Sequence, residues 1–395
     1  MISVEEASAI ILANLIIPQK KKVTITEALS KILAEDIFAD RDFPPFHRAT
    51  MDGIAIHLQV YQNGKRNFKI ESVMAAGEPK KKLQDSFNVI EIMTGAAIPE
   101  GTNTVIPYEN FLLKDGVATL TDIKVELGQN IHSQGSDARQ GEKLLSSGTV
   151  ISSADVAILA SVGKSKVLIF ELPKAAIIST GNELVGIHQM PLVYQVRISN
   201  SYALQAAYAK MGGESSLFHL PDEEASIATE LKTILTSFDL ILLSGGVSKG
   251  KFDFIPQSLE ALGIKKSFHQ ISQRPGKPMW FGRSETKFAF ALPGNPVSTF
   301  MCFHRYVRPW VMASLGVASI TEKAILATDF TFEAPLTFFL QVKLKNEDGK
   351  LMAYPVTGGG SGDFVNLKDV DGFLELPKES ITFKRGDAYP FIQFR

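Results

Sequence analysis

The sequence contains a single cysteine, Cys302, among its 395 residues. One cysteine cannot form a disulfide within the chain or a cysteine-rich metal site, so a reducing compartment such as the cytoplasm is expected. Long apolar runs are also missing, and we therefore predict no transmembrane helix and no membrane partner. The charges nearly cancel, with 41 basic and 42 acidic residues, which argues against binding to nucleic acid.

The signatures of several common enzyme classes are absent as well. No zinc-ligand spacing, HExxH, GxSxG or GxxxxGK[ST] motif occurs in the chain, which argues against the usual zinc sites, serine hydrolases and P-loop proteins. Cys302 and His304 lie in the apolar run FMCFHRYV and are expected to be structural. The chain has 45% hydrophobic and 21% charged residues. This is the balance of a globular protein, and the length predicts two to four domains.

Local patterns in the first part of the chain predict helices and then β-hairpins. Capping boxes at Ser3-x-x-Glu6 and Thr24-x-x-Glu27 predict two short helices at the start. From about 54 to 131, short alternating runs are separated by the turn pairs Asn63-Gly64 and Asp115-Gly116. Alternating runs divided by such pairs are typical of β-hairpins.

The pattern changes twice more along the chain. A short helix is predicted at 154–161, and from about 174 strand-like runs alternate with helical ones. This alternation predicts an α/β layer with a largely parallel sheet. Beyond about 316 short strands return, and we expect a small β-barrel or sandwich there.

Three loops follow predicted strands of the α/β region and are small, polar or rich in glycine. Ligands of open α/β sheets bind beyond the carboxyl ends of the strands, where glycines let backbone N–H groups approach an anion. A tight turn is the commoner explanation for any one such loop, whereas three at one sheet edge favour a ligand site. The candidate phosphate-binding residues are Ser179, Thr180, Gly181, Ser244, Gly245, Gly246, Pro293, Gly294, Asn295 and Ser298.

Charged residues in other turns complement these loops. Arg274 and Lys277 flank a Pro-Gly turn and suit a phosphate or another oxyanion. Asp52, Glu183 and Asp253 stand beside glycine or small polar residues, where a carboxylate can hold Mg²⁺. Turn formation or helix capping is an equally good explanation of each carboxylate taken singly. The residues alone therefore indicate a multidomain enzyme that handles a phosphorylated ligand with Mg²⁺.

Five longer blocks stand out along the chain: FPPFHRATMDGIAI, IMTGAAIPEGTNTVI, IISTGNELV, LLSGGVSKGKFDF, and RPGKPMWFG with ALPGNPVSTF. In this order they resemble the molybdopterin molybdenumtransferase (MoeA) family, to which the C-terminal domain of gephyrin is also similar. A weaker match, GGGSGDFVNL, extends the resemblance over almost the whole chain. The resemblance implies that molybdenum from molybdate is inserted into adenylylated molybdopterin with release of AMP. It also implies Mg²⁺ or Zn²⁺ as a cofactor.

The same resemblance implies a multidomain fold of α/β and β parts. The expected domains are an elongated helical and β segment at 1–45 and 140–172, an inserted β domain at 46–139, a three-layer α/β (MogA-like) domain at 173–316 and a C-terminal β-barrel at 317–395. A homodimer is implied, with the active cleft between the α/β domain of one subunit and the β domain of the other. Transient partners would be a molybdopterin adenylyltransferase and apo-molybdoenzymes.

Four expected catalytic residues follow from the matched motifs. Asp52 corresponds to the aspartate of the MDG block, and Thr94 to the threonine of MTG. Glu183 stands at the glutamate of STGDEL, and Asp253 matches the second aspartate of a GDYD-like stretch. Asp137 matches a GED-like stretch and is expected to join Glu183 and Asp253 as a metal ligand.

The oxyanion-binding residues implied by the resemblance are Thr94 together with the two basic residues of a KPGKP-like turn. Arg274 and Lys277 occupy those two basic places. Arginine at the first of them keeps the charge of the usual lysine but changes its geometry.

Several positions depart from the family pattern. Asn182 replaces an aspartate, Lys251 replaces an acidic residue, and His47-Arg48-Ala49 replaces polar residues before MDG. The stretch 130–139 lacks the arginines usual before GED, although Arg139 could substitute. Two alternatives to the enzyme therefore stay open. One is a scaffold protein that holds molybdopterin or the cofactor, and the other is an adenylyltransferase, which the extra β domains disfavour.

Overall fold

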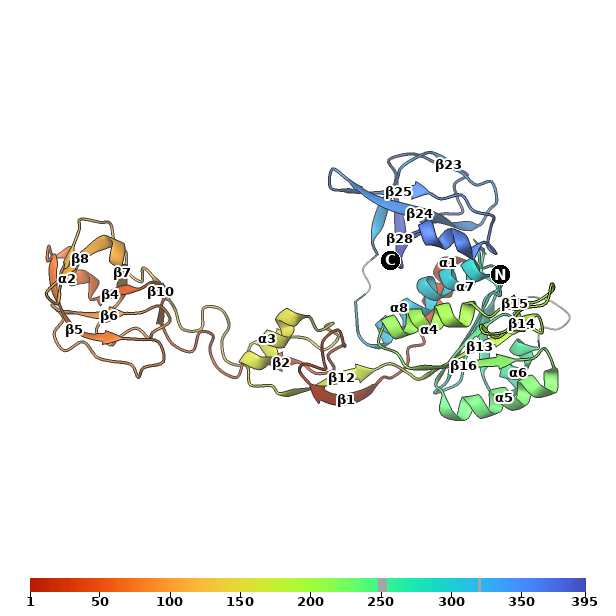
Figure 1. Cartoon of the computed structure of the whole chain (residues 1–395), viewed down its shortest axis with the longest axis horizontal. Coiled ribbons are helices and arrows are strands. Elements are labelled where there is room, and N and C mark those ends of the chain that lie inside the picture. The colour runs from red at the N-terminus through yellow and green to blue at the C-terminus, as the bar shows by residue number, and fades with distance from the viewer. Residues whose placement is uncertain (248–253, 319–320) are drawn as a thin grey trace.

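The computed structural model describes residues 1–247, 254–318 and 321–395 and shows an elongated molecule (Figure 1). A β domain lies at one end, a narrow segment lies in the middle, and an α/β domain with a barrel beside it lies at the other end. The chain starts at the α/β end, runs out to the β domain and returns. Within the described residues, none of the helices has the length and apolar character needed to cross a membrane.

The middle segment is built from two stretches of the chain, one that runs out to the β domain and one that returns from it, and the two stretches pair with each other. Its strands and helix are β1 (Gln19–Thr24), β2 (Ile37–Phe38), β11 (Lys143–Leu145), α3 (Ser153–Ser161) and β12 (Lys166–Glu171). β1 pairs with β12 and β2 pairs with β11, both antiparallel. The helix predicted at 154–161 is confirmed, with Ser152 and Asp155 forming its capping box.

The first of the two N-terminal helices is confirmed and the second is wrong. α1 (Val4–Leu12) is capped by Ser3 and buries its apolar face against the α/β core. The Thr24 and Glu27 bonds also form, but residues 25–30 make turns instead of a helix. The backbone N–H of Ser30 instead donates to Ile151 (2.8 Å), and that of Leu33 donates to Thr149 (2.9 Å). Pairing with the returning chain therefore overrides the local signal.

The β domain contains a six-stranded sheet in the order β7-β4-β6-β5-β9-β8. Its elements are β3 (Arg48–Ala49), β4 (Gly53–Ile56), α2 (Leu58–Gln62), β5 (Asn67–Met74), β6 (Val89–Ile92), β7 (Thr104–Pro107), η1 (Tyr108–Asn110), β8 (Phe111–Lys114), β9 (Val117–Leu120) and β10 (Ile131–His132). β3 and β10 pair where the chain enters and leaves the domain. Asp115 and Gly116, with φ of 51° and 75°, form the predicted hairpin turn between β8 and β9.

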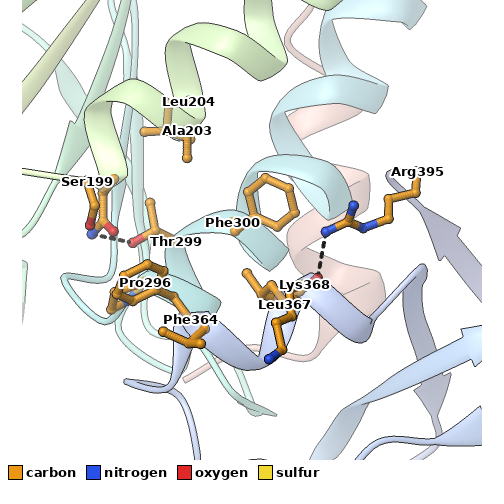
Figure 2. Close-up of a pocket in the computed structure, with 12 residues that line it drawn as sticks. Ser199, Ala203, Leu204, Pro296, Thr299, Phe300, Phe364, Leu367, Lys368 and Arg395 are labelled. Atoms are coloured by element: carbon orange, nitrogen blue, oxygen red, sulfur yellow. Dashed lines mark hydrogen bonds between the residues drawn. The ribbon is translucent and has the colours of Figure 1, made fainter.

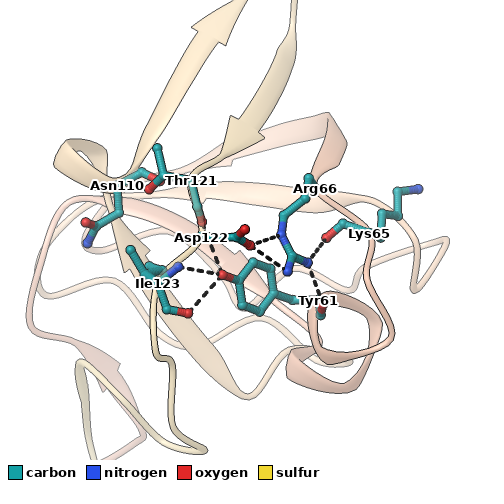
Figure 3. Close-up of polar contacts among 7 residues, drawn as sticks. All are labelled: Tyr61, Lys65, Arg66, Asn110, Thr121, Asp122 and Ile123. Atoms are coloured by element: carbon teal, nitrogen blue, oxygen red, sulfur yellow. Dashed lines mark hydrogen bonds and ion pairs between the residues drawn. The ribbon is translucent and has the colours of Figure 1, made fainter.

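The other predicted hairpin turn, Asn63-Gly64, is wrong because it ends α2. The strand that follows is held beside the segment after β9 by a polar cluster (Figure 3). The Tyr61 hydroxyl donates to the Ile123 carbonyl (2.9 Å), and Arg66 binds Asp122 (2.8 Å). A helix capped by Asn63 presents Tyr61 to this cluster, which a hairpin turn could not do.

The α/β domain has a six-stranded sheet between two apolar cores, which makes three layers. The sheet order is β16-β13-β17-β21-β20-β18. In this sheet β20 is antiparallel to both of its neighbours, and the other five strands run in one direction, so the largely parallel sheet is confirmed. The elements are β13 (Ala175–Thr180), β14 (Leu184–Val185), β15 (Val196–Arg197), α4 (Asn200–Lys210), β16 (Ser215–Leu220), α5 (Glu224–Ser237), β17 (Leu240–Ser244), α6 (Ile255–Ala261), β18 (Lys265–His269), β20 (Trp280–Arg283), β21 (Phe288–Leu292), α7 (Pro296–Cys302), the π-helix η2 (Phe303–Val307) and α8 (Arg308–Ser314).

The last part of the chain forms a closed β-barrel. Strands follow the order β24-β25-β22-β28-β26, and β26 pairs back onto β24. The elements are β19 (Gln273–Arg274), which adds to β24, then β22 (Lys323–Leu326), β23 (Phe330–Thr331), β24 (Thr337–Glu347), β25 (Lys350–Pro355), η3 (Phe364–Asp369), β26 (Gly372–Leu376), β27 (Thr382–Phe383) and β28 (Ala388–Gln393). The expected fold class, a multidomain α/β and β protein with a C-terminal barrel, is thus confirmed.

Candidate functional site

The three predicted loops begin side by side at the carboxyl edge of the α/β sheet. β13, β17 and β21 are adjacent, with Ser179 paired to Ser244 and Ser244 paired to Leu292. The Gly245 N–H donates to the Leu292 carbonyl (3.2 Å), so the second loop touches the start of the third. The structure therefore brings together the loops that the sequence predicted separately.

Close approach of the loops requires glycine at two of the predicted positions. Gly245 and Gly246 have φ of 98° and 65°, a region that side chains disfavour. A Cβ at either position would lie 2.9 or 3.1 Å from the Thr180 hydroxyl. Only hydrogen at these positions lets the first two loops meet.

Thr180 carries a buried hydroxyl without a hydrogen-bond partner among the described residues. Its residue is 6% exposed. A buried hydroxyl left unpaired costs about 1–3 kcal/mol, and a bound ligand oxygen would relieve that cost. Ser179 differs, because its hydroxyl donates to the Phe218 carbonyl of β16 (3.3 Å). Thr180 is therefore the better candidate of the two.

Asn200 joins two of the loops and was missed by the sequence analysis. Its side-chain Nδ2 donates to Ser244 Oγ and to the Gly294 carbonyl, both at 2.8 Å. A longer contact of 3.3 Å reaches Thr299 Oγ1, as Figure 2 shows. Asn200 is the first residue of α4, and its position just before an apolar helical pattern gave no signal of this role.

The barrel contributes a second residue that sequence reasoning missed. Ser361, in the glycine-rich loop 358–362, accepts a hydrogen bond from Asn295 Nδ2 through its Oγ (2.8 Å). Its carbonyl accepts from the Val297 N–H (3.1 Å). Ser298 is buried in this first turn of α7. The barrel loop is thus attached to the third loop of the candidate site.

The first loop also holds Glu183, an exposed carboxylate with no hydrogen-bond or ion-pair partner in the part of the chain that the structure describes. Next to it, Asn182 and Asp222 exchange hydrogen bonds, each side chain accepting from the other's N–H (3.2 and 3.3 Å). Asparagine here avoids a second negative charge against Asp222, which gives the Asn182 departure a local reason. A free carboxylate at this edge fits one ligand of a divalent cation.

The rest of the expected metal set is not assembled within one chain. Asp253, together with the departure Lys251, lies outside the described residues. Among the residues that are described, no three His, Cys, Asp or Glu side chains converge as a metal site. Asp137 follows β10 and Glu183 follows β13, and these two strands lie far apart in the molecule (Figure 1).

Arg274 and Lys277 follow β18, whose carboxyl end is at the same edge of the sheet because β18 and β21 are both antiparallel to β20. His269 Nε2 bonds the Val247 carbonyl (2.8 Å), which ties this end of the sheet to the second loop. Both cations are exposed, and the Arg274 guanidinium lies 5.9 Å above the Phe332 ring of the barrel. Arg274 and Lys277 therefore lie at the same edge of the sheet as the three loops, but they make no direct contact with the described residues of those loops.

Asp52 and Thr94 meet in the β domain. The N–H and the hydroxyl of Thr94 donate to Asp52 Oδ1 at 2.6 and 2.8 Å. These two hydrogen bonds hold the pKa of Asp52 below its ordinary value, so the carboxylate stays ionised at neutral pH. The pair is exposed; Asp52 comes just before β4 and Thr94 follows β6, and these strands lie at the opposite end of the molecule from β13, which Glu183 follows (Figure 1).

Asp137 belongs to a separate network beside the β domain. His132 Nε2 bonds Asp137 Oδ1 (2.7 Å), and Arg48 Nη2 bonds His132 Nδ1 (3.2 Å). The hydrogen bond from His132, with another from Ser136, holds the pKa of Asp137 below its ordinary value. Arg48, from the departure before MDG, thus supplies a cation to the stretch that lacks the usual arginines.

Comparisons with known proteins cover the whole chain. Family models match residues 2–163 as the MoeA N-terminal region (domain I and II), 176–313 as a probable molybdopterin binding domain and 323–394 as the MoeA C-terminal region (domain IV). A molybdopterin molybdenumtransferase from Synechocystis is 39% identical over 99% of both chains. One from Bacillus subtilis is 30% identical over 94% of this chain and 89% of its own. The crystal structure of a molybdopterin biosynthesis moeA protein from Pyrococcus horikoshii superposes with a TM-score of 0.85 at 28% identity, covering both chains fully.

Proposed function

The chain belongs to the molybdopterin molybdenumtransferase (MoeA) family, and on this basis we infer that it acts in molybdenum cofactor biosynthesis as a transferase that inserts molybdenum into molybdopterin. We further propose that the substrate is adenylylated molybdopterin, that molybdate supplies the metal, and that AMP is released. The observation that carries this proposal is that three anion-suited loops begin at one edge of the sheet, beside a Thr180 hydroxyl that has no hydrogen-bond partner among the described residues.

The loops suit a substrate with several negative charges. The backbone N–H of Gly246 and the Thr180 hydroxyl can hold phosphate oxygens without an added counter-charge. Arg274 and Lys277, exposed at the same edge, neutralise charge that would otherwise repel molybdate from the phosphates. The backbone N–H and the buried Thr180 hydroxyl are in place before the ligand arrives, so these two groups need little reorganisation during the reaction.

We propose Mg²⁺, or Zn²⁺ in its place, as the cofactor of this site. Glu183 would be one ligand and Asp253 the second. A bound cation would supply positive charge that offsets the negative charge of the phosphates. Asp137 is proposed as a metal ligand only through a second subunit.

We also propose a cytoplasmic homodimer in which the second subunit supplies Asp52 and Thr94. Thr94 fixes an ionised Asp52 on an exposed surface, and the strands next to the pair, β4 and β6, lie at the opposite end of the molecule from the α/β strand β13 (Figure 1). A molybdopterin adenylyltransferase would deliver the substrate, and apo-molybdoenzymes would receive the product. The scaffold and adenylyltransferase alternatives have no supporting observation.

The test is a purified assay with adenylylated molybdopterin, Mg²⁺ and molybdate, following AMP release and activation of an apo-molybdoenzyme. We expect both, each dependent on molybdate, and we expect Glu183→Ala to lose both while keeping its oligomeric state. The matched control is Glu214→Ala, because Glu214 lies just before β16, away from the carboxyl edge. Full activity of Glu183→Ala would show that the site is misplaced, and an inactive wild-type chain would overturn the proposed function.

A further inference from the structure

A cavity of about 480 Å³ lies directly beside the three loops, between the α/β domain and the barrel (Figure 2). Leu204 of α4 and Phe300 of α7 line one side, and Phe364 and Leu367 of η3 line the other. The walls are mostly apolar, and the volume is within the range of about 300–1,000 Å³ typical of small-molecule sites. Neither the loops nor the expected metal site uses this space.

The walls of the cavity are held in place by contacts outside it. The Phe300 ring packs edge-on against Phe394 (4.8 Å between centroids) and against His304 (4.6 Å). The η3 side is attached to the α/β domain through the hydrogen bonds of Ser361. A cavity with fixed aromatic walls can bind a flat ring without first ordering its own side chains.

Polar groups stand at two opposite places on the rim. Asn200 lies on the side of the loops, and its Oδ1 accepts no hydrogen bond from the described residues. Lys368 and Arg395 lie on the far side, where Arg395 is oriented by the carbonyls of Leu367 (2.9 Å) and Val370 (3.0 Å). One side of the rim therefore offers an acceptor and the other offers cationic donors.

We propose that this cavity binds the pterin ring of the substrate, an inference that rests on the proposed function. A pterin carries its carbonyl oxygen on the pyrimidine ring, at the end away from the side chain, so with the phosphate on the loops this oxygen would face the donors Lys368 and Arg395 on the far side of the cavity. Adenine has an amino group but no ring oxygen for the cations to bind. The observations therefore favour the pterin half of the substrate over its adenylate half.

Asn200 also explains how one molecule would occupy both places. The residue lines the cavity and, through Nδ2, bonds Ser244 and Gly294 of two loops. A ligand with its ring in the cavity and its phosphate on the loops would cross this point. The sulfur-bearing carbons between ring and phosphate would then lie beside Asn200, at the mouth of the loops where molybdate is proposed to bind.

The test fills the cavity and measures two ligands separately. Ala203 lines the cavity on an exposed position of α4, so Ala203→Trp occupies space without disturbing the core. Ala206→Trp is the matched control, because Ala206 is exposed on the same helix and does not line the cavity. The probes are a 6-substituted pterin phosphate, followed by its own fluorescence, and AMP, followed by calorimetry.

We expect Ala203→Trp to weaken binding of the pterin phosphate about tenfold or more, since it removes most ring contacts, and to leave AMP binding unchanged. Phe364→Ala should act in the same direction and Phe364→Tyr should restore binding. Loss of AMP binding instead of pterin binding, loss of both, or loss of neither would overturn the inference. If wild type releases AMP in the transferase assay while Ala203→Trp binds the pterin normally, this inference fails and the proposed function stands. A wild-type chain that releases no AMP overturns both.

Discussion

At the residue scale, Thr180 carries the buried, unpaired hydroxyl that we propose binds a phosphate oxygen of the ligand. Its hydroxyl is buried against Gly245 and Gly246 and has no partner among the described residues. We expect Thr180→Val to raise the free energy of unfolding by about 1 kcal/mol, because an unpaired polar group is removed. The same change should weaken AMP binding about tenfold, the value of one charge-assisted hydrogen bond. Denaturant unfolding and calorimetry measure the two effects.

Thr180→Ser is the matched control for this prediction, because it keeps the oxygen and removes only a methyl group. It should bind AMP as wild type does and lose about 1 kcal/mol of stability to the small cavity. The two variants thus shift stability in opposite directions, and only Thr180→Val weakens AMP binding. If Thr180→Val is destabilised and binds AMP normally, the hydroxyl has a structural role only.

Individual candidate site residues could be predicted where the composition of a loop or a family motif indicated them. Thr180 and Glu183 stand in such a loop, and Asp52 and Thr94 stand in matched motifs that the structure brings into contact. Asn200 and Ser361 could not be predicted in this way. Their side chains act on residues 44 or more positions away, and that proximity exists only after the strands and the barrel have formed.

At the scale of elements, the helix from α7 to α8 contains the π-helix η2, which carries a buried histidine. His304 packs against Phe300 and Phe394, and neither ring nitrogen has a partner among the described residues. Burial, with help from Arg308 and Lys210, lowers the pKa of His304 from 6.5 to about 3. Between pH 6.5 and about 3, the imidazole of His304 therefore binds a proton in the unfolded chain but not in the folded chain.

This difference predicts a stability that falls as the pH falls below about 6.5. The free energy of unfolding should decrease by about 1.4 kcal/mol per pH unit, or about 2 kcal/mol between pH 6.5 and 5, from His304 alone. His304→Phe keeps the aromatic contacts and should remove this part of the acid dependence. Urea unfolding at pH 7 and 5 measures it, with His188→Gln as the control because His188 is exposed. Equal pH dependence in wild type and His304→Phe would contradict the account.

Elements were predictable where local pattern and tertiary environment agree. The central strands β13, β17 and β21 are buried along their whole length because both faces of the sheet are covered, and α4 buries Leu204 and Tyr208 on its inner face. The helix expected after Thr24 failed because Ser30 and Leu33 pair with a segment almost 120 residues away. A capping box reports only local bonds, and those bonds did form.

At the scale of the whole molecule, the candidate residues fall into two groups that lie far apart. A single chain does not explain how the two groups would act together. The loops with Glu183 lie at one end and the Asp52–Thr94 pair lies at the other, with the middle segment between them (Figure 1). The family resemblance predicted both groups and a dimer to unite them, whereas composition and periodicity gave no sign of the distance. A symmetric dimer allows the β domain of each subunit to reach the α/β domain of the other.

Subunit complementation tests this arrangement. Asp52→Ala and Glu183→Ala are each expected to be inactive as homodimers, since every site then lacks one residue. A heterodimer of the two, isolated through different tags, holds one site with both residues intact and one with neither, so about half of the wild-type AMP release should return. The control heterodimer of Glu183→Ala with Lys277→Ala should stay inactive, because both changes lie in the α/β domain and no site escapes them. An inactive Asp52→Ala and Glu183→Ala heterodimer would mean that each site is built within one subunit, which the elongated chain could achieve only by bending its middle segment.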